Sequence, residues 1–309
     1  MFHPMVYAWI FPFPVRLGLI LVSCVFVRRF ILRSRRRLAG LHAVDLDGVS
    51  RTPTIFSTLQ DFYQKTVDVC GASHGGVDIL DLGRLVARLQ ERLENGVKSK
   101  IVFCHNDLQS GNIMYNKVTP CVTALQPAVR ASQAPAGEDS ECGKVAAQLP
   151  PPPGGPTLIL SASPTLPSTA AERLCLIDYE YSGYNPRGFD VGNHFCEWMA
   201  DYEQAEPHFL TFDSYPGDDD KRRFSRAYLG ATLGVPDIDV SPEEVDHLVV
   251  EADAYSLASH LMWAFWALLQ SKGDAVAPGF DYARYAAERI RAYHHFEGQF
   301  LPAAQRPKP

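Results

Sequence analysis

The sequence lacks the cysteine pattern of a small disulfide-bonded or zinc-binding domain. Its seven cysteines in 309 residues are odd in number, scattered and never spaced as C-x-x-C, which indicates a reducing compartment. Nucleic acid is also an unfavourable partner. Residues 1–37 contain seven arginines and no acid, so residues 38–309 hold 22 basic and 35 acidic residues, a net charge of −13. An acidic body of that kind suits cationic ligands, although solubility explains it equally well.

A long hydrophobic run is missing too. Residues 5–27 are apolar except for Arg16, but the uninterrupted run covers only residues 17–27, whereas a membrane span needs roughly 20 residues. The basic cluster follows this run, which argues against a cleavable signal peptide. We therefore expect a cytoplasmic protein in which residues 1–37 are either an N-terminal membrane anchor, with the rest in the cytosol, or a mis-assembled gene start.

The remaining chain divides by composition. Residues 119–172 hold ten of the 23 prolines and otherwise many Ala, Ser, Thr and Gly residues, which predicts a disordered surface insertion. Residues 301–309 read as a tail. Residues 38–118 and 173–300 are expected to form the ordered body.

Periodicity predicts mostly helices in that body, with a few strands. Apolar residues recur on one helical face over residues 78–95, and the capping box at residues 241–244 opens a helix that extends to about Gln270. A last amphipathic helix covers residues 281–296. Strands are predicted at residues 101–104, 113–115 and 174–177, and the last two are expected to pair as a hairpin whose loop carries the insertion.

The residues most suited to catalysis follow the strand predicted at residues 101–104. His105, Asp107 and Asn112 have the spacing H-x-D-x-x-x-x-N, which is the layout of a kinase catalytic loop. There the Asp accepts the proton of a substrate hydroxyl and the Asn ligates Mg²⁺. A polar turn capped by its own Asn and Asp is the alternative reading. Asp178, at the end of the strand at residues 174–177 and followed by an aromatic residue, is placed like the second metal-binding Asp of kinases and makes the turn reading less favourable.

Three sequence blocks carry a resemblance to a known family. HNDLQSGNIMY, IDYEYSGYNPRGFDVGNHFCEW and LASHLMWAFWALLQ resemble the choline/ethanolamine kinase family in the same order, over residues 38–118 and 173–300. The resemblance implies an α+β fold, a protein-kinase-like C-terminal lobe that is mostly helical with short β-hairpins. Residues 1–37 offer no Gly-rich loop, Lys or acid, so we expect the N-terminal nucleotide lobe of the family to be absent.

The resemblance also implies a role for each site residue. Asp107 would be the catalytic base, and Asn112 and Asp178 the Mg²⁺ ligands, whereas His105 and Asp190 would support the catalytic loop. Substrate-binding residues would be Gln109, Tyr181, Glu197, Tyr202, Trp263, Trp266 and Tyr282. Aromatic faces with nearby negative charge suit a quaternary ammonium, which has no N–H donor. Without the resemblance, core packing would be the better explanation of Trp263 and Trp266.

The expected function is that of a choline kinase, which transfers the γ-phosphate of ATP to choline for phosphatidylcholine synthesis, with Mg²⁺ as cofactor. Ethanolamine is the close alternative acceptor, and a truncated non-catalytic relative is an alternative of another class. An aminoglycoside phosphotransferase or protein kinase is disfavoured, because Asn106 and Asp178-Tyr179-Glu180 replace the residues that a protein kinase would have. The expected partners are choline or ethanolamine, ATP and a second copy of the chain, with no nucleic acid.

Overall fold

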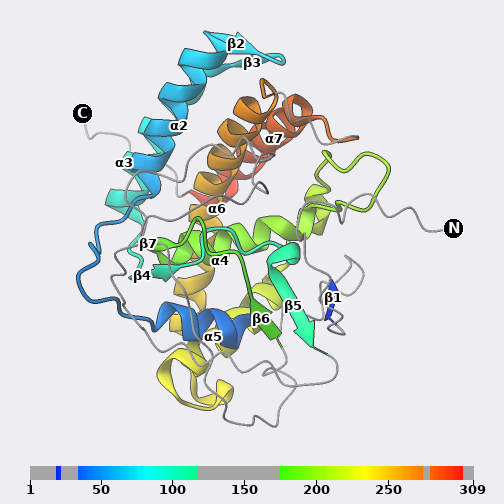
Figure 1. Cartoon of the computed structure of the whole chain (residues 1–309). Helices are drawn as coiled ribbons and strands as arrows, with labels where there is room; N and C mark the ends of the chain where they lie inside the picture. The colour runs from blue at the N-terminus through cyan, green and yellow to red at the C-terminus, as the bar shows by residue number, and fades with distance from the viewer. Residues whose placement is uncertain (1–18, 22–33, 117–173, 274–278, 302–309) are drawn as a thin grey trace, which may run out of the picture.

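The computed structural model describes residues 19–21, 34–116, 174–273 and 279–301, which are mostly helical with a few short strands (Figure 1). The helices are α2 (Ile55–Cys70), α3 (Ile79–Gly96), α4 (Arg187–Cys196), α5 (Asp218–Leu233), α6 (Pro242–Gln270) and α7 (Tyr282–Phe300), and residues 34–42 are also helical. The 3₁₀ turns are η2 (Ser110–Asn112), η4 (Glu197–Met199), η5 (Phe212–Ser214) and η6 (Asp237–Asp239). The predictions for the insertion at 119–172 and for most of residues 1–37 and 301–309 concern segments outside the described residues. Within the described part, no helix is both long enough and apolar enough to cross a membrane.

The three helices predicted from periodicity are confirmed, and each begins at a side-chain cap. The carboxylate of Asp78 accepts from Asp81 N–H at 3.0 Å before α3, and Ser241 Oγ accepts from Glu244 N–H at 3.1 Å before α6. Asp281 accepts from Arg284 N–H at 2.9 Å before α7, which continues to Phe300, four residues beyond its predicted end. Such caps satisfy amide groups that the first turn of a helix leaves without partners.

The strands form three small antiparallel sheets. Strands β5 (Ile113–Asn116) and β6 (Leu174–Leu176) pair as predicted, and β1 (Leu19–Leu21) lies along the other edge of β5. Strand β4 (Ile101–Cys104) also matches its prediction, but its partner β7 (Gly183–Pro186) was not predicted. The short pair β2 (Ser73–His74) and β3 (Val77–Asp78) connects α2 to α3.

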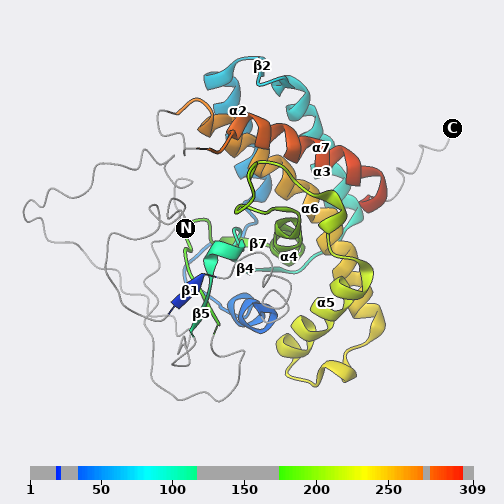
Figure 2. The same cartoon turned by 90° about the vertical axis from the view of Figure 1, so that its right-hand side faces the viewer.

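Helix α6 is the centre of the core. The second half of α6, predicted to be buried, packs against α2, α4 and α7, and Figure 2 shows α4 nearly end-on beside α6. Two glycines allow this close crossing. A Cβ on Gly192 would lie 2.3 Å from the Ala252 carbonyl oxygen, and one on Gly188 would lie 2.9 Å from that of Glu251. Helix α4 is therefore held rigidly against α6, along with the polar side chains that it carries.

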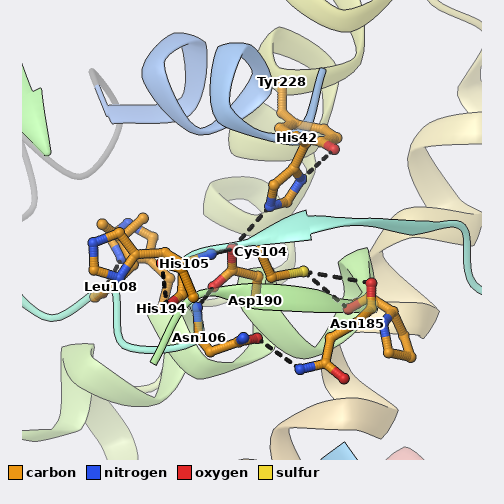
Figure 3. Close-up of polar contacts among 12 residues, drawn as sticks. His42, Cys104, His105, Asn106, Leu108, Asn185, Asp190, His194 and Tyr228 are labelled. Atoms are coloured by element: carbon orange, nitrogen blue, oxygen red, sulfur yellow. Dashed lines mark hydrogen bonds and ion pairs between the residues drawn. The ribbon is translucent and has the colours of Figure 1, made fainter. Parts of the chain in front are cut away.

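One of those side chains, Asp190, connects α4 to the end of β4 (Figure 3). Its carboxylate accepts from the backbone N–H groups of His105 at 2.7 Å and Asn106 at 2.8 Å, and from His42 Nε2 at 2.9 Å. Burial raises the pKa of Asp190, but the hydrogen bond and charge of His42 outweigh burial and leave this pKa below its ordinary value. One turn later on α4, His194 Nδ1 donates to the Leu108 carbonyl oxygen at 2.9 Å. The loop that starts at His105 is thus attached to α4 at its start and again at Leu108.

We expect Gly192→Ala to destabilise the fold by about 1–3 kcal/mol, because the added methyl group would push α4 away from the backbone of α6. The matched control is Gly298→Ala in α7, where a Cβ meets nothing within 4 Å. That control should be neutral or gain up to about 1 kcal/mol from helix propensity. Urea denaturation measures both, and equal stability of the two variants would contradict the close crossing.

We expect Asp190→Asn to lower the free energy of unfolding by about 3–5 kcal/mol, because an amide places an N–H group where a buried carboxylate accepts three donors. Asp246→Asn is the control, since Asp246 pairs with Arg222 at the surface and about half of each side chain is exposed. Surface pairs contribute at most about 1 kcal/mol. Thermal denaturation of both variants tests this difference, and a loss below 1 kcal/mol in Asp190→Asn would argue against the role of Asp190.

Candidate active site

The loop between β4 and β5 carries Asp107 and Asn112. The side-chain Nδ2 of Asn112 donates to the Asp107 backbone oxygen at 2.8 Å and to Asp107 Oδ2 at 3.0 Å. Gln109 lies between them, and its backbone oxygen accepts from Asn112 N–H at 3.1 Å. Because Nδ2 of Asn112 is used within the loop, the other terminal atom of this amide, the acceptor Oδ1, remains for a ligand.

Asp178 comes from a neighbouring loop, two residues after the end of β6. The Ile177 N–H donates to the Asn112 carbonyl oxygen at 3.0 Å, and His105 Nε2 donates to the Ile177 carbonyl oxygen at 3.0 Å. The loop that begins at His105 and the Asp178 loop are therefore joined beside the two predicted metal ligands. The Asp178 side chain itself is exposed.

Both loops contain a strained residue. Asn106 and Asp178 each have a φ of 65°, the left-handed region that side chains other than glycine rarely adopt. Asn106 is held there by its neighbours: Nδ2 donates to the Tyr181 carbonyl oxygen at 2.8 Å, and Oδ1 accepts from Asn185 Nδ2 at 3.0 Å. Asn185 Oδ1 in turn accepts from Thr54 N–H and Ile55 N–H, both at 2.8 Å, and so caps α2. A left-handed conformation held by several contacts, as at Asn106, is typical of functional loops.

Acidic side chains gather around these loops. Burial, followed by the charges of Glu197 and Asp178, raises the pKa of Asp107 well above its ordinary value, while the hydrogen bond from Asn112 acts in the opposite direction. Burial and the charge of Asp178 also raise the pKa of Glu180. A raised carboxyl pKa brings Asp107 toward the range in which a general base is most effective.

Two groups of residues could hold a cation. Asn112 and Asp178 offer hard oxygen atoms from adjoining loops, a donor set that fits Mg²⁺. His42, Cys104 and Asp190 also have ligand atoms within 4.8 Å of one another. However, both His42 nitrogens are hydrogen-bonded, to Asp190 and to Tyr228 OH at 2.7 Å, and the Cys104 thiol donates to the Asn185 carbonyl oxygen. This buried trio is explained by its own hydrogen bonds.

The predicted aromatic residues form a continuous chain. Ring centroids are 5.7 Å apart for Tyr181 and Trp263, 5.7 Å for Trp263 and Trp266, and 5.6 Å for Trp266 and Tyr282, all in edge-to-face contact. Trp263 is only 8% exposed, and its Nε1 donates to Asn193 Oδ1 at 2.8 Å, so it also serves as a core residue. The other three rings are partly exposed.

Glu197 and Tyr202 lie in a second part of the site. Tyr202 OH donates to Glu197 Oε2 at 2.9 Å, and Arg289 of α7 donates to Glu197 Oε1 at 2.8 Å. The ion pair with Arg289 was not predicted. Because of this pair, the negative charge of Glu197 is partly balanced. Burial and the charge of Glu197 raise the pKa of Tyr202 well above its ordinary value, which keeps its proton available for this hydrogen bond.

Sequence reasoning missed several residues that shape the site. They are His42, Asn185, Asn193, Phe280, Tyr285 and Arg289. Phe280 extends the aromatic chain, with its ring centroid 4.9 Å from that of Tyr282 and 5.3 Å from that of Tyr285. The spacing of Tyr282, Tyr285 and Arg289 along one helical face was a signal that could have identified the last two.

Comparison with known proteins identifies the family of this chain. The family model for choline/ethanolamine kinase matches residues 29–294. "Probable choline kinase 1" of Arabidopsis thaliana is 32% identical over 205 residues, covering 66% of this chain and 42% of the relative. Human "Choline/ethanolamine kinase" is 29% identical over 273 residues, covering 85% and 55%.

Among solved structures, a choline kinase from Cryptosporidium parvum superimposes with a TM-score of 0.62 at 18% identity. The match covers 90% of this chain and 68% of that one. The chain spans about half the length of the curated relatives described above. Because the family model matches most of the chain, this protein belongs to the choline/ethanolamine kinase family.

Proposed function

We propose that the protein is a choline kinase, which transfers the γ-phosphate of ATP to the choline hydroxyl to give phosphocholine for phosphatidylcholine synthesis. The observation that carries this proposal is the joining of the Asp107–Asn112 loop to the Asp178 loop through the Ile177–Asn112 hydrogen bond. Family membership supports ATP as the co-substrate. The Cryptosporidium structure supports the family fold, and we propose that the body corresponds to the protein-kinase-like C-terminal lobe.

In this proposal Asp107 accepts the hydroxyl proton of the acceptor. Its carboxylate is oriented by Asn112 Nδ2, and its raised pKa suits the task of a base that must both take up and release a proton. His105 and Asp190 act as supports, since their contacts are to backbone groups of the two loops. Gln109, next to Asp107 in the loop, would lie near the acceptor.

Asn112 and Asp178 would hold Mg²⁺ through their side-chain oxygens. When bound, the metal ion would neutralise charge on the phosphates of ATP. The chain's own part is to keep these two side chains on adjoining loops and to leave Asp107 free to face the acceptor.

The acceptor would bind against the aromatic chain formed by Tyr181, Trp263, Trp266 and Tyr282, with Glu197 and Tyr202 nearby. Aromatic faces attract a trimethylammonium group that cannot donate hydrogen bonds. This chain of rings favours choline over ethanolamine, which would instead need acceptor atoms around its ammonium. Ethanolamine remains the second candidate, because relatives include proteins named ethanolamine kinase. The homodimer and the non-catalytic alternative stay predictions.

The base assignment predicts that Asp107→Asn lowers turnover by about 10²–10⁴-fold, because the amide keeps the shape and removes the proton acceptor. Phosphocholine formation from ATP and choline by the full chain is the measurement. The control Asp68→Asn changes a surface carboxylate on α2 that accepts a hydrogen bond from Gln64 Nε2 at 2.9 Å, and this variant should retain activity. Full activity of Asp107→Asn would remove Asp107 from the role of base.

The aromatic site predicts that Trp266→Leu raises the choline KM about 2- to 30-fold, which corresponds to the roughly 0.5–2 kcal/mol of a cation–π contact. The KM for ATP should stay nearly fixed, and preference should shift toward ethanolamine. Phe265→Leu is the control, because this fully buried neighbour packs against Tyr63 in the core. It should lower thermal stability without changing amine preference. Equal losses for both amines in Trp266→Leu would contradict the aromatic site.

A further inference from the structure

Arg289 of α7 is a fully buried guanidinium beside the proposed acceptor site. Its Nη2 donates to Glu197 Oε1 at 2.8 Å, and its Nε donates to Tyr285 OH at 2.8 Å. Among the described residues, Glu197 is the carboxylate with which Arg289 forms an ion pair. Both side chains are nearly inaccessible, with 1% of the Arg289 and 6% of the Glu197 side chain exposed.

Burial of this kind makes the pair interdependent. A guanidinium group that is shielded from water is tolerated in a folded protein only when an anion compensates its charge. Burial lowers the pKa of Arg289, but Tyr285 and Glu197 outweigh burial and raise this pKa well above its ordinary value. Arg289 therefore stays charged beside the Glu197 carboxylate.

The pair also leaves Glu197 with little freedom. One carboxylate oxygen accepts from Arg289, and the other accepts from Tyr202 OH. These donors come from two separate segments, Tyr202 from the segment after η4 and Arg289 from α7. The carboxylate keeps one orientation, with lone pairs left over for a further contact.

We propose that Arg289 is a positioning residue of the acceptor site, which holds the Glu197 carboxylate in one orientation beside the bound amine. This inference rests on the proposed function, in which Glu197 contributes to acceptor binding. It predicts that Arg289 affects affinity for the acceptor through Glu197 and without touching the acceptor itself.

The chain contains a matched control pair. Arg187 of α4 donates from Nε to Glu251 Oε2 at 2.9 Å and from Nη2 to Oε1 at 2.6 Å, and this pair is also buried. Its carboxylate has further contacts with Ser99 and His247, and none with the aromatic chain. Arg187 variants therefore report what loss of a buried ion pair does to the fold alone.

The test is a double-mutant cycle on the full chain, with the choline Kd from calorimetric titration and the Tm from thermal denaturation. The variants are Glu197→Gln, Arg289→Met, Arg289→Lys, the double variant Glu197→Gln/Arg289→Met, and Arg187→Met. Glu197→Gln and Arg289→Met should each weaken choline binding about 10-fold, equivalent to roughly 1.4 kcal/mol. The double variant should bind choline no more weakly than Glu197→Gln alone, because the two residues act as one unit. Arg187→Met should lower Tm and leave Kd within about 2-fold.

The outcomes separate the inference from the proposed function. Wild-type protein without choline binding, or Glu197→Gln with unchanged Kd, would contradict the proposed function. Two results would overturn the inference alone, provided that Glu197→Gln binds choline more weakly than wild-type protein. One is an unchanged choline Kd in both Arg289 variants, and the other is additive losses of affinity in the double variant. If Arg289→Met does not fold, Arg289→Lys and the double variant, in which no buried charge is left unpaired, still decide the question.

Discussion

The carboxylate of Asp190 accepts hydrogen bonds from the backbone of His105 and Asn106, and the positions of both candidate loops depend on this contact. Asp190 lies on α4, which is held against α6 by the close approach of Gly188 and Gly192. A small displacement of α4 would therefore move Asp107 and, through the Ile177–Asn112 hydrogen bond, Asp178 as well. The close packing of α4 against α6 thus determines the geometry of the loops that carry Asp107 and Asp178.

The proposed acceptor side of the site depends on the same helices. Helix α4 leads directly into Glu197, α6 carries Trp263 and Trp266, and α7 carries Tyr282 and Arg289. Helix α6 packs against both α4 and α7, so the aromatic rings and the buried Glu197–Arg289 pair share one compact region. Sites built on packed helices hold their side chains more precisely than sites on loops.

Much of this arrangement could be predicted from the sequence, because the signals were local. Apolar periodicity located α3 and α7, the capping box at residues 241–244 marked the start of α6, and the spacing of His105, Asp107 and Asn112 indicated the loop chemistry. Contacts between distant residues could not be predicted in this way. Strand β7 (Gly183–Pro186) consists of residues common in turns and becomes a strand through pairing with β4. His42 reaches Asp190 across 148 positions, and Arg289 reaches Glu197 across 92, so no local pattern identifies either pair.

We propose that Asp107, Asn112 and Asp178 form one cation-dependent site for phosphoryl transfer. Titration of the full chain with Mn²⁺, followed by electron paramagnetic resonance of the free ion, tests this claim most directly. The account predicts that wild-type protein binds Mn²⁺, that Asp178→Ala weakens this binding at least about 10-fold, and that Asp219→Ala, in the acidic first turn of α5, leaves it unchanged. Equal Mn²⁺ affinity in wild-type protein and Asp178→Ala would contradict it.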